Sequence, residues 1–268
     1  MSEKSSWKDS ITWKLIFGVL IGWIVLALVF SIFDLQISIA MVNQTNPFGV
    51  FGADYGEIPG YALIGIAIVV LIGSYNSNLK KQKIGAFIFI ILAIILGIVG
   101  ILIDSGTLME LGGTIGFSLI AFTSITYNKD WRPYRTIALV ILLLAIINPI
   151  LFVNITKPLC GRIRFRDLIP PDYIGYTPWY HPPGFDLENL SFPSGHTAMG
   201  WMLLPLLIPL RDKELTMKLI GSILILGWGF FVGLSRVLVG AHYTSDVLFA
   251  TGVAFITVIL LYKRLYLK

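Results

Sequence analysis

Charged side chains are scarce in this 268-residue sequence. Asp, Glu, Lys and Arg together make up 13% of it, whereas 56% of the residues are hydrophobic, and the mean hydropathy is +0.82. A soluble domain of this length cannot bury so much apolar surface, so the composition excludes a soluble protein. Cysteine is nearly absent as well. Cys160 stands alone, which excludes a disulfide within the chain.

Long apolar stretches are abundant, and eight of them predict eight membrane-spanning helices. A hydrocarbon core of roughly 30 Å takes about 20 residues per helical crossing, and stretches near that length recur along the whole chain. This excludes a soluble enzyme with a single anchor and predicts an all-α, polytopic membrane helix bundle. The predicted crossings are residues 13–33, 58–75, 84–104, 111–127, 136–155, 197–210, 219–239 and 246–262.

Three of these crossings need comment. The first could be a cleaved signal peptide, but its 21 residues exceed the apolar region of such a peptide and no small-x-small site follows. We therefore expect it to remain as an anchor. The fourth and sixth crossings are short, so the sequence defines their ends poorly.

The distribution of Lys and Arg predicts that both termini are cytoplasmic. Cytoplasmic loops are enriched in these residues, and segments 34–57 and 104–110 contain acidic residues but no Lys or Arg. The net charge is +5, and the Lys and Arg residues lie in short clusters between apolar stretches. Such clusters suit anionic lipid headgroups better than a nucleic-acid surface, so we expect no nucleic-acid partner. The basic residues assigned to the cytoplasmic side are Lys4, Lys8, Lys14, Lys80, Lys81, Lys83, Lys129, Arg132, Arg135, Arg211, Lys213, Lys218, Lys263, Arg264 and Lys268.

One segment that this topology places outside, residues 157–192, breaks the positive-inside pattern. It carries Lys157, Arg162, Arg164 and Arg166 directly after an apolar helix. Such side chains can extend to the membrane surface and meet lipid phosphates there, or they can form part of a phosphate site. The three arginines alternate, so in an extended segment they would share one face.

Two further polar clusters fall on the same predicted side. Residues 191–197, Ser-Phe-Pro-Ser-Gly-His-Thr, lead into an apolar helix, whose free N–H groups and positive dipole end outline an anion site. A plain Ser N-cap with a glycine turn explains this motif too. The other cluster contains His242 and Asp246, four residues apart, so a helical turn sets both on one face. Residues 244–246 could merely cap the final helix, but an Asp at the head of an apolar helix is costly unless paired.

The order and spacing of these motifs resemble the phosphatidic acid phosphatase type 2 and vanadium haloperoxidase superfamily. Its pattern is Lys, six residues, Arg-Pro; then Pro-Ser-Gly-His; then Ser-Arg, five residues, His, three residues, Asp. Phe165 stands where the family usually has proline. The matching positions are Lys157, Arg164, Pro193, Ser194, Gly195, His196, Ser235, Arg236, His242 and Asp246.

The resemblance implies a six-helix catalytic core over residues 84–268, with residues 1–83 as a cytoplasmic tail and two additional membrane helices. It also implies a metal-independent lipid phosphatase that works through a phosphohistidine. His242 would be the nucleophile, Asp246 would orient it, and His196 would protonate the departing lipid oxygen. The groups that would bind the substrate phosphate are Lys157, Arg164, Ser194, Gly195 and Arg236.

Other residues near these motifs are less defined. Arg162 and Arg166 could be further phosphate ligands or could face lipid headgroups, and His181 lies in the outer loop with no motif around it. The clusters hold too few Asp, Glu and His residues for a Mg²⁺ or Zn²⁺ cage, so we expect neither metal nor cofactor.

The substrate class follows from the depth of the site. Residues 167–190 mix prolines and glycines with aromatic residues, which predicts a stiff lid over lipid chains or an interfacial anchor. A site at the extracytoplasmic surface of the cell membrane favours an amphiphile such as phosphatidic acid, phosphatidylglycerol phosphate or undecaprenyl diphosphate. A lipid phosphotransferase with the same histidines, or a non-catalytic phospholipid binder or transporter, remains an alternative. The sequence leaves the oligomeric state open.

Overall fold

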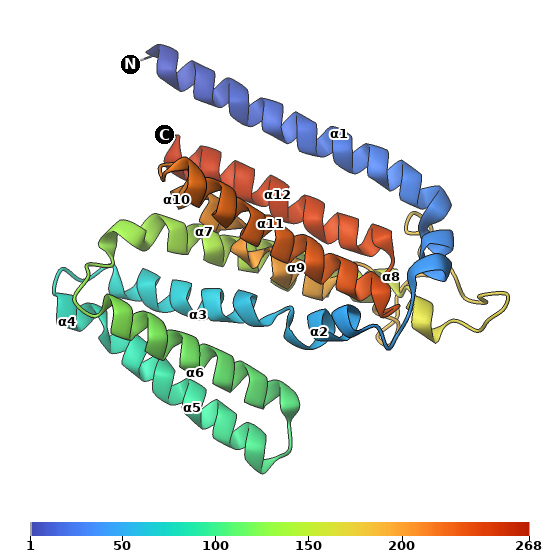
Figure 1. The fold of residues 1–268 in the computed structure, drawn as a ribbon, viewed down its shortest axis with the longest axis horizontal. Coiled ribbons are helices and arrows are strands. Elements are labelled where there is room, and N and C mark those ends of the chain that lie inside the picture. The colour runs from blue at the N-terminus through green and yellow to red at the C-terminus, as the bar shows by residue number, and fades with distance from the viewer. Residues whose placement is uncertain (1, 268) are drawn as a thin grey trace. The chain divides into compact units, whose positions relative to one another are not determined.

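A computed structural model describes residues 2–267 of the chain, with side chains described from residue 10 onward. Of the basic residues used to predict the orientation, Lys268 and the side chains of Lys4 and Lys8 lie outside the described part. The described chain is helical throughout its regular structure (Figure 1), apart from one isolated β-bridge between Ile169 and Ile174.

Seven stretches are long and apolar enough to cross a membrane, and one shorter apolar stretch accompanies them. The protein is therefore a multi-pass membrane protein, and the predicted fold class is confirmed. Many large apolar side chains on these stretches, such as Ile91 and Ile223, are exposed, as expected where helices face lipid. The long stretches are Ser10–Met41, Pro47–Gly73, Leu79–Leu102, Gly106–Thr126, Arg132–Asp167, Leu215–Leu238 and Thr244–Tyr266, and the shorter one is Gly195–Leu210.

The first compact unit consists of the chain up to residue 56 and from residue 144 onward. In it, α1 (Ser2–Met41) runs along α12 (Thr244–Tyr266), and α2 (Pro47–Tyr55) packs on α11 (Leu215–Leu238) (Figure 1). The prediction that the first helix ends at Phe33 is wrong, because α1 continues through Asp34 to Met41. The sequence placed Asp34 in an outer loop, whereas its carboxylate is fully buried and paired.

The helical stretch that carries Lys157 changes its helix type along its length without a break in the helix. Helix α7 (Arg135–Ala145) passes into a π-helical segment, Ile146–Val153, and then into α8 (Asn154–Cys160). Pro149 lies in the π-helical segment, and proline disrupts regular α-helical hydrogen bonding because it has no N–H and its ring clashes with the preceding turn. Helix α8 ends at Gly161, whose φ of +55° favours glycine and turns the chain back.

The short apolar stretch spans more distance than its 16 residues suggest. It consists of α9 (Gly195–Gly200), the 3₁₀ segment Trp201–Leu206 and α10 (Leu207–Leu210). A 3₁₀ helix rises about 2.0 Å per residue against 1.5 Å in an α-helix. The stretch is therefore about 27 Å long, close to the roughly 30 Å of a hydrocarbon core.

The second compact unit, residues 57–143, contains α3 (Ile58–Gly73), α4 (Leu79–Gln82), α5 (Ile84–Leu102), α6 (Gly106–Thr126) and the beginning of α7. Helices α5 and α6 form a hairpin (Figure 1) in which Gly97 and Gly112 allow close backbone approach. At the other end of these helices the buried Lys83 donates a hydrogen bond of 2.7 Å to the carbonyl of Lys129.

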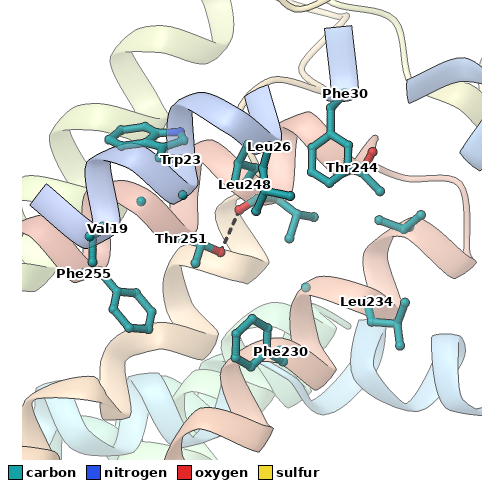
Figure 2. Close-up of a pocket in the computed structure, with 16 residues that line it drawn as sticks. Val19, Trp23, Leu26, Phe30, Phe230, Leu234, Thr244, Leu248, Thr251 and Phe255 are labelled. Carbon is teal, nitrogen blue, oxygen red and sulfur yellow. Dashed lines mark hydrogen bonds between the residues drawn. The ribbon is translucent and has the colours of Figure 1, made fainter. Parts of the chain in front are cut away.

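An apolar groove of about 410 Å³ lies between α1, α11 and α12 in the first unit. Figure 2 shows Trp23 and Leu26 of α1 with Phe230 of α11 and Phe255 of α12 around it. The hydroxyl of Thr251 on its wall is satisfied by the carbonyl of Val247, 2.8 Å away. No charged side chain lines this groove in the described part of the chain, so a phosphate site lies elsewhere.

Candidate active site

His242 and Asp246 lie at the junction of α11 and α12, where the chain turns through Gly240 with a φ of +67°. His242 is 2% exposed and Asp246 is fully buried. The Nδ1 atom of His242 is 3.4 Å from Oδ2 of Asp246. This distance is long for a hydrogen bond, but catalytic hydrogen bonds often shorten only when the substrate binds. The carboxylate can thus orient the imidazole with its Nε2 atom directed away from Asp246.

The surroundings keep His242 neutral. Burial lowers the pKa of His242 to about 4, although the Asp246 carboxylate acts in the opposite direction. The cations of Arg236 and Lys157 lower this pKa further. At neutral pH the ring is therefore unprotonated, which is the state that a nucleophilic or basic histidine requires.

Asp246 is held by several hydrogen-bond donors in addition to its contact with His242. Its Oδ2 atom accepts hydrogen bonds from Ser191 Oγ at 2.6 Å and from the backbone N–H of Tyr243 at 3.0 Å. Its backbone carbonyl accepts from the N–H of Ser194 at 3.1 Å. The motif that begins at Ser191 and the motif that ends at Asp246 are therefore joined directly.

The Pro-Ser-Gly-His motif forms the start of α9. Ser194 is its N-cap, and its hydroxyl oxygen accepts from the backbone N–H of Thr197 at 3.3 Å and from Thr197 Oγ1 at 2.8 Å. A Cβ atom placed on Gly195 would lie 3.5 Å from Nζ of Lys157. The ammonium group of Lys157 therefore lies beside the first turn of α9.

His196 brings the remaining groups together. It lies within electrostatic range of Lys157, Arg236 and His242, and its ring hydrogen-bonds the backbone of Ala53 on α2. Arg236 is in the last turn of α11, and its carbonyl accepts from the N–H of His242 at 3.2 Å. Two imidazoles, those of His196 and His242, and two cations, those of Lys157 and Arg236, thus lie within electrostatic range of one another.

Arg164 lies on a segment that is tied to the His242 loop. The N–H of Arg166 donates to the carbonyl of Gly240 at 3.0 Å. Among the described residues, the buried Nε atom of Arg164 has no hydrogen-bond partner, which leaves this donor for a ligand. Phe165, which replaces the family's proline, packs against Tyr173 and Tyr243 with ring centroids 5.4 and 6.3 Å apart.

Arg162 fits neither role that the sequence allowed for it. It is 1% exposed, so it does not face headgroups, and its guanidinium donates to two carboxylates, those of Asp34 and Asp246, at 2.9 and 2.6 Å. The prediction assumed an extended segment in which alternate arginines share one face. The 3₁₀ turn Phe165–Asp167 breaks that alternation at Arg166.

Asp34 is the residue of this region that sequence reasoning missed. Its signal was present, because an aspartate inside an apolar helix is as costly as Asp246 unless it is paired. His181, by contrast, is exposed in the loop, and its role as a bystander stays a prediction. Within the described residues, no three His, Cys, Asp or Glu side chains are grouped in a way that could hold a metal ion.

The loop of residues 168–190 is anchored on the first compact unit by its aromatic side chains. Trp179 Nε1 donates to the carbonyl of Ala27 on α1 at 3.2 Å, and its ring lies 4.8 Å from that of Phe249 on α12. Tyr176 packs on Tyr243 at 5.6 Å. Phe185 is exposed, so it is free to contact lipid.

Comparison with known proteins adds one finding. Residues 138–268 match the family model described as the PAP2 superfamily. The match contains all of the predicted site residues, which lie between Lys157 and Asp246, and it excludes α1 through α6. No solved structure matches the chain.

Proposed function

Because residues 138–268 form a PAP2 superfamily domain in a multi-pass membrane protein, we propose that this protein is a lipid phosphatase that acts through a phosphohistidine at His242. The observation that carries the proposal is that His196, His242, Arg236 and Lys157 lie within electrostatic range of one another, with Asp246 next to His242. These groups come from four different helical elements and the loop before α12, and no structural need of a membrane helix bundle requires them to meet.

The chemistry follows from the positions of these groups. Phosphoryl transfer depends mainly on positioning and on neutralising the charge of the equatorial oxygens. Lys157, Arg164 and Arg236 supply the positive charge, and the Ser194 hydroxyl and Gly195 N–H supply neutral donors. The substrate phosphate would therefore lie between α8, α9 and the end of α11.

In the first step, Nε2 of the neutral His242 attacks phosphorus, and the bond from phosphorus to the lipid oxygen breaks. His196 starts protonated and gives its proton to that oxygen, so the lipid leaves as an alcohol, or as a monophosphate when the substrate is a diphosphate. In the second step, water attacks the phosphohistidine and gives a proton to His196. Inorganic phosphate leaves, and both imidazoles return to their starting states.

The substrate is proposed to be an amphiphile with a terminal phosphate, such as phosphatidic acid, phosphatidylglycerol phosphate or undecaprenyl diphosphate. Two features support this class. The site residues adjoin membrane-spanning helices, and the exposed Phe185 of the neighbouring loop can rest among lipid chains. We propose further that this end of the helices faces the extracytoplasmic side, as the Lys and Arg distribution predicts.

The test is phosphate release by the purified protein from a panel of these lipids, with a chelator present. We expect His242→Ala to lower turnover at least about 1,000-fold, as loss of a nucleophile does in other covalent enzymes. The matched control is His181→Ala, which removes an exposed imidazole and should leave turnover unchanged.

Three outcomes would contradict the proposal. Full turnover by His242→Ala would exclude the covalent route, and absence of turnover by the unmodified protein on every lipid would favour a binder or transporter. Phosphate appearing on an added alcohol instead of in solution would identify a phosphotransferase.

A further inference from the structure

We propose that Asp34 of α1 is a positioning residue for the reaction, acting on His242 through Arg162 and Asp246. The inference rests on the proposed function and extends the site beyond the PAP2 domain, since α1 lies outside residues 138–268. Four groups would then form one chain, in the order Asp34, Arg162, Asp246, His242.

The Asp34 carboxylate is saturated by donors from around the catalytic residues. It is fully buried. Its Oδ2 atom accepts from Nη2 of Arg162 at 2.9 Å and from the hydroxyl of Ser245. Its Oδ1 atom accepts from the backbone N–H of Ser245 at 3.0 Å and from the hydroxyl of Thr244. Both residues of α12 that it binds adjoin Asp246.

Arg162 joins the two carboxylates through separate arms. Nη1 donates to Oδ1 of Asp246 at 2.6 Å and to Ser245 Oγ at 2.8 Å, while Nη2 is directed to Asp34. Its Nε atom donates to the carbonyl of Thr177 at 2.9 Å, and its guanidinium lies 3.9 Å above the ring of Tyr243. A guanidinium held on three sides in this way has one orientation.

The two carboxylate oxygens of Asp246 therefore contact different groups. Oδ1 is fixed by Arg162, which leaves Oδ2 to face His242 Nδ1 together with Ser191 and the N–H of Tyr243. Without Asp34, Nη2 of Arg162 would lose its acceptor and the guanidinium could rotate. The Oδ1 contact would then loosen, and with it the orientation of the carboxylate that steers the imidazole.

Charge supports the same conclusion. Two buried carboxylates and one guanidinium carry a net charge of −1 next to His242, whereas Asp246 and Arg162 alone would be neutral. The ring gains positive charge when it attacks phosphorus, and the other charged or titratable groups facing it are Arg236, Lys157 and His196. The extra negative charge from Asp34 therefore stabilises the phosphohistidine state.

If Asp34 served only to attach α1 to its neighbours, the identity of its hydrogen-bond donors would be left unexplained. Helix α1 has other attachments to its neighbours, since the Trp23 ring lies where a Cβ atom of Gly252 would be, and Trp179 donates to the Ala27 carbonyl. The donors to Asp34 are instead concentrated on Arg162 and on the two residues before Asp246.

The test is a double-mutant cycle on the full-length protein, with Asp34→Asn, Asp246→Asn and the double variant assayed on the best lipid substrate. We expect Asp34→Asn to lower kcat about 10- to 100-fold, with KM changed less than about threefold, because the phosphate ligands are untouched. In the Asp246→Asn background the same change should lower kcat less than about threefold, because the residue through which Asp34 acts is already altered.

Two further variants make the outcome interpretable. Asp104→Asn removes an exposed carboxylate and should leave kcat unchanged. If Asp34→Asn fails to fold, Ser245→Ala replaces it: this variant deletes one donor to Asp34 and one acceptor of Arg162 without leaving a buried charge unpaired. It should lower kcat several-fold, again with a much smaller effect in the Asp246→Asn background.

The inference is overturned if Asp34→Asn, or Ser245→Ala in its place, retains the kcat of the unmodified protein, or if its effect is the same in both backgrounds. A rise in KM with unchanged kcat would also overturn it. Failure of the proposed function is distinguishable, because it would appear as full activity of His242→Ala.

Discussion

At the scale of single residues, the two site histidines differ in their surroundings. His242 is buried next to Asp246, whereas His196 is partly exposed and its ring hydrogen-bonds the backbone of Ala53 on α2. A carboxylate behind an imidazole favours attack by the far nitrogen of the ring. This difference supports the proposed roles of His242 in attack and of His196 in protonation of the leaving group.

Replacing His196 tests this assignment through the leaving group. We expect His196→Gln to lower turnover of a phosphorylated lipid by about 10²- to 10⁴-fold, the usual contribution of a general acid. The loss should be much smaller for formation of the phosphoenzyme from an aryl phosphate, because a phenolate of low pKa leaves without a proton. Rapid-mixing measurement of the released phenol checks this. Equal losses for both leaving groups would remove His196 from the role of acid.

At the scale of elements, the site depends on how closely α11 approaches the short helix that begins at Gly195. Gly229 of α11 faces the buried ring of Trp201, and a Cβ atom there would lie 2.4 Å from that ring. The indole is further fixed by a hydrogen bond of 2.8 Å from its Nε1 atom to Thr251 Oγ1 on α12. Trp201 therefore cannot move aside easily, and the position of His196, one and a half turns earlier, depends on this contact.

Two glycines of the same helix give a matched pair for this contact. We expect Gly229→Ala to destabilise the protein by about 1–3 kcal/mol, the usual cost of overpacking, and to lower turnover by displacing α9. Gly227→Ala meets no atom within 4 Å and should be neutral or slightly stabilising, because alanine favours helix. Thermal unfolding in detergent measures both. Equal stability of the two variants would show that the close approach is unimportant.

The sequence predicted the elements well wherever apolar length alone defines them. The stretch at residues 219–239 is an example, since it corresponds to Leu215–Leu238. It failed where a polar residue is buried within a helix. Asp34 was read as the start of a loop because an unpaired carboxylate ends a membrane helix, and its partner Arg162 is 128 residues away in sequence. Such a pairing cannot be read from local periodicity.

The candidate site shows the same limit. The sequence identified most of the site residues from the order of their motifs alone. Motif spacing does not predict which of these residues are neighbours, whereas the contacts described above do show it. The residues are Lys157, Ser194, Gly195, His196, Arg236, His242 and Asp246. Their roles remain proposals. Arg162 contacts Asp246 and Asp34, which are 84 and 128 residues away in sequence, and motif spacing does not reveal such contacts.

At the scale of the whole molecule, the proposed division at residue 83 was drawn from the family's six-helix core, and it stays a prediction. Packing divides the chain differently, because α1 and α2 belong to the compact unit that holds the site, whereas residues 57–143 form the other unit. The first membrane helix is therefore paired, through Asp34, with Arg162 of the matched domain, although the helix precedes that domain.

The predicted orientation is tested on the intact protein by cysteine labelling. In a Cys160→Ser background, His181→Cys should react with a membrane-impermeant maleimide added to whole cells, because the positive-inside pattern places residues 157–192 outside. Lys80→Cys should react only after the membrane is opened. The reverse pattern would place the site on the cytoplasmic side and would change the pool of lipids it meets, without altering the chemistry.

The central claim is that His242 becomes covalently phosphorylated during turnover. The most direct measurement uses the purified protein, a lipid substrate labelled in its terminal phosphate, an alkaline quench and mass spectrometry of the peptides. The predicted result is a label that is stable in alkali, labile in acid and located on His242, and that is present in His181→Ala and absent from His242→Ala. Continued turnover with no label on His242, or with the label on another residue, would contradict the account.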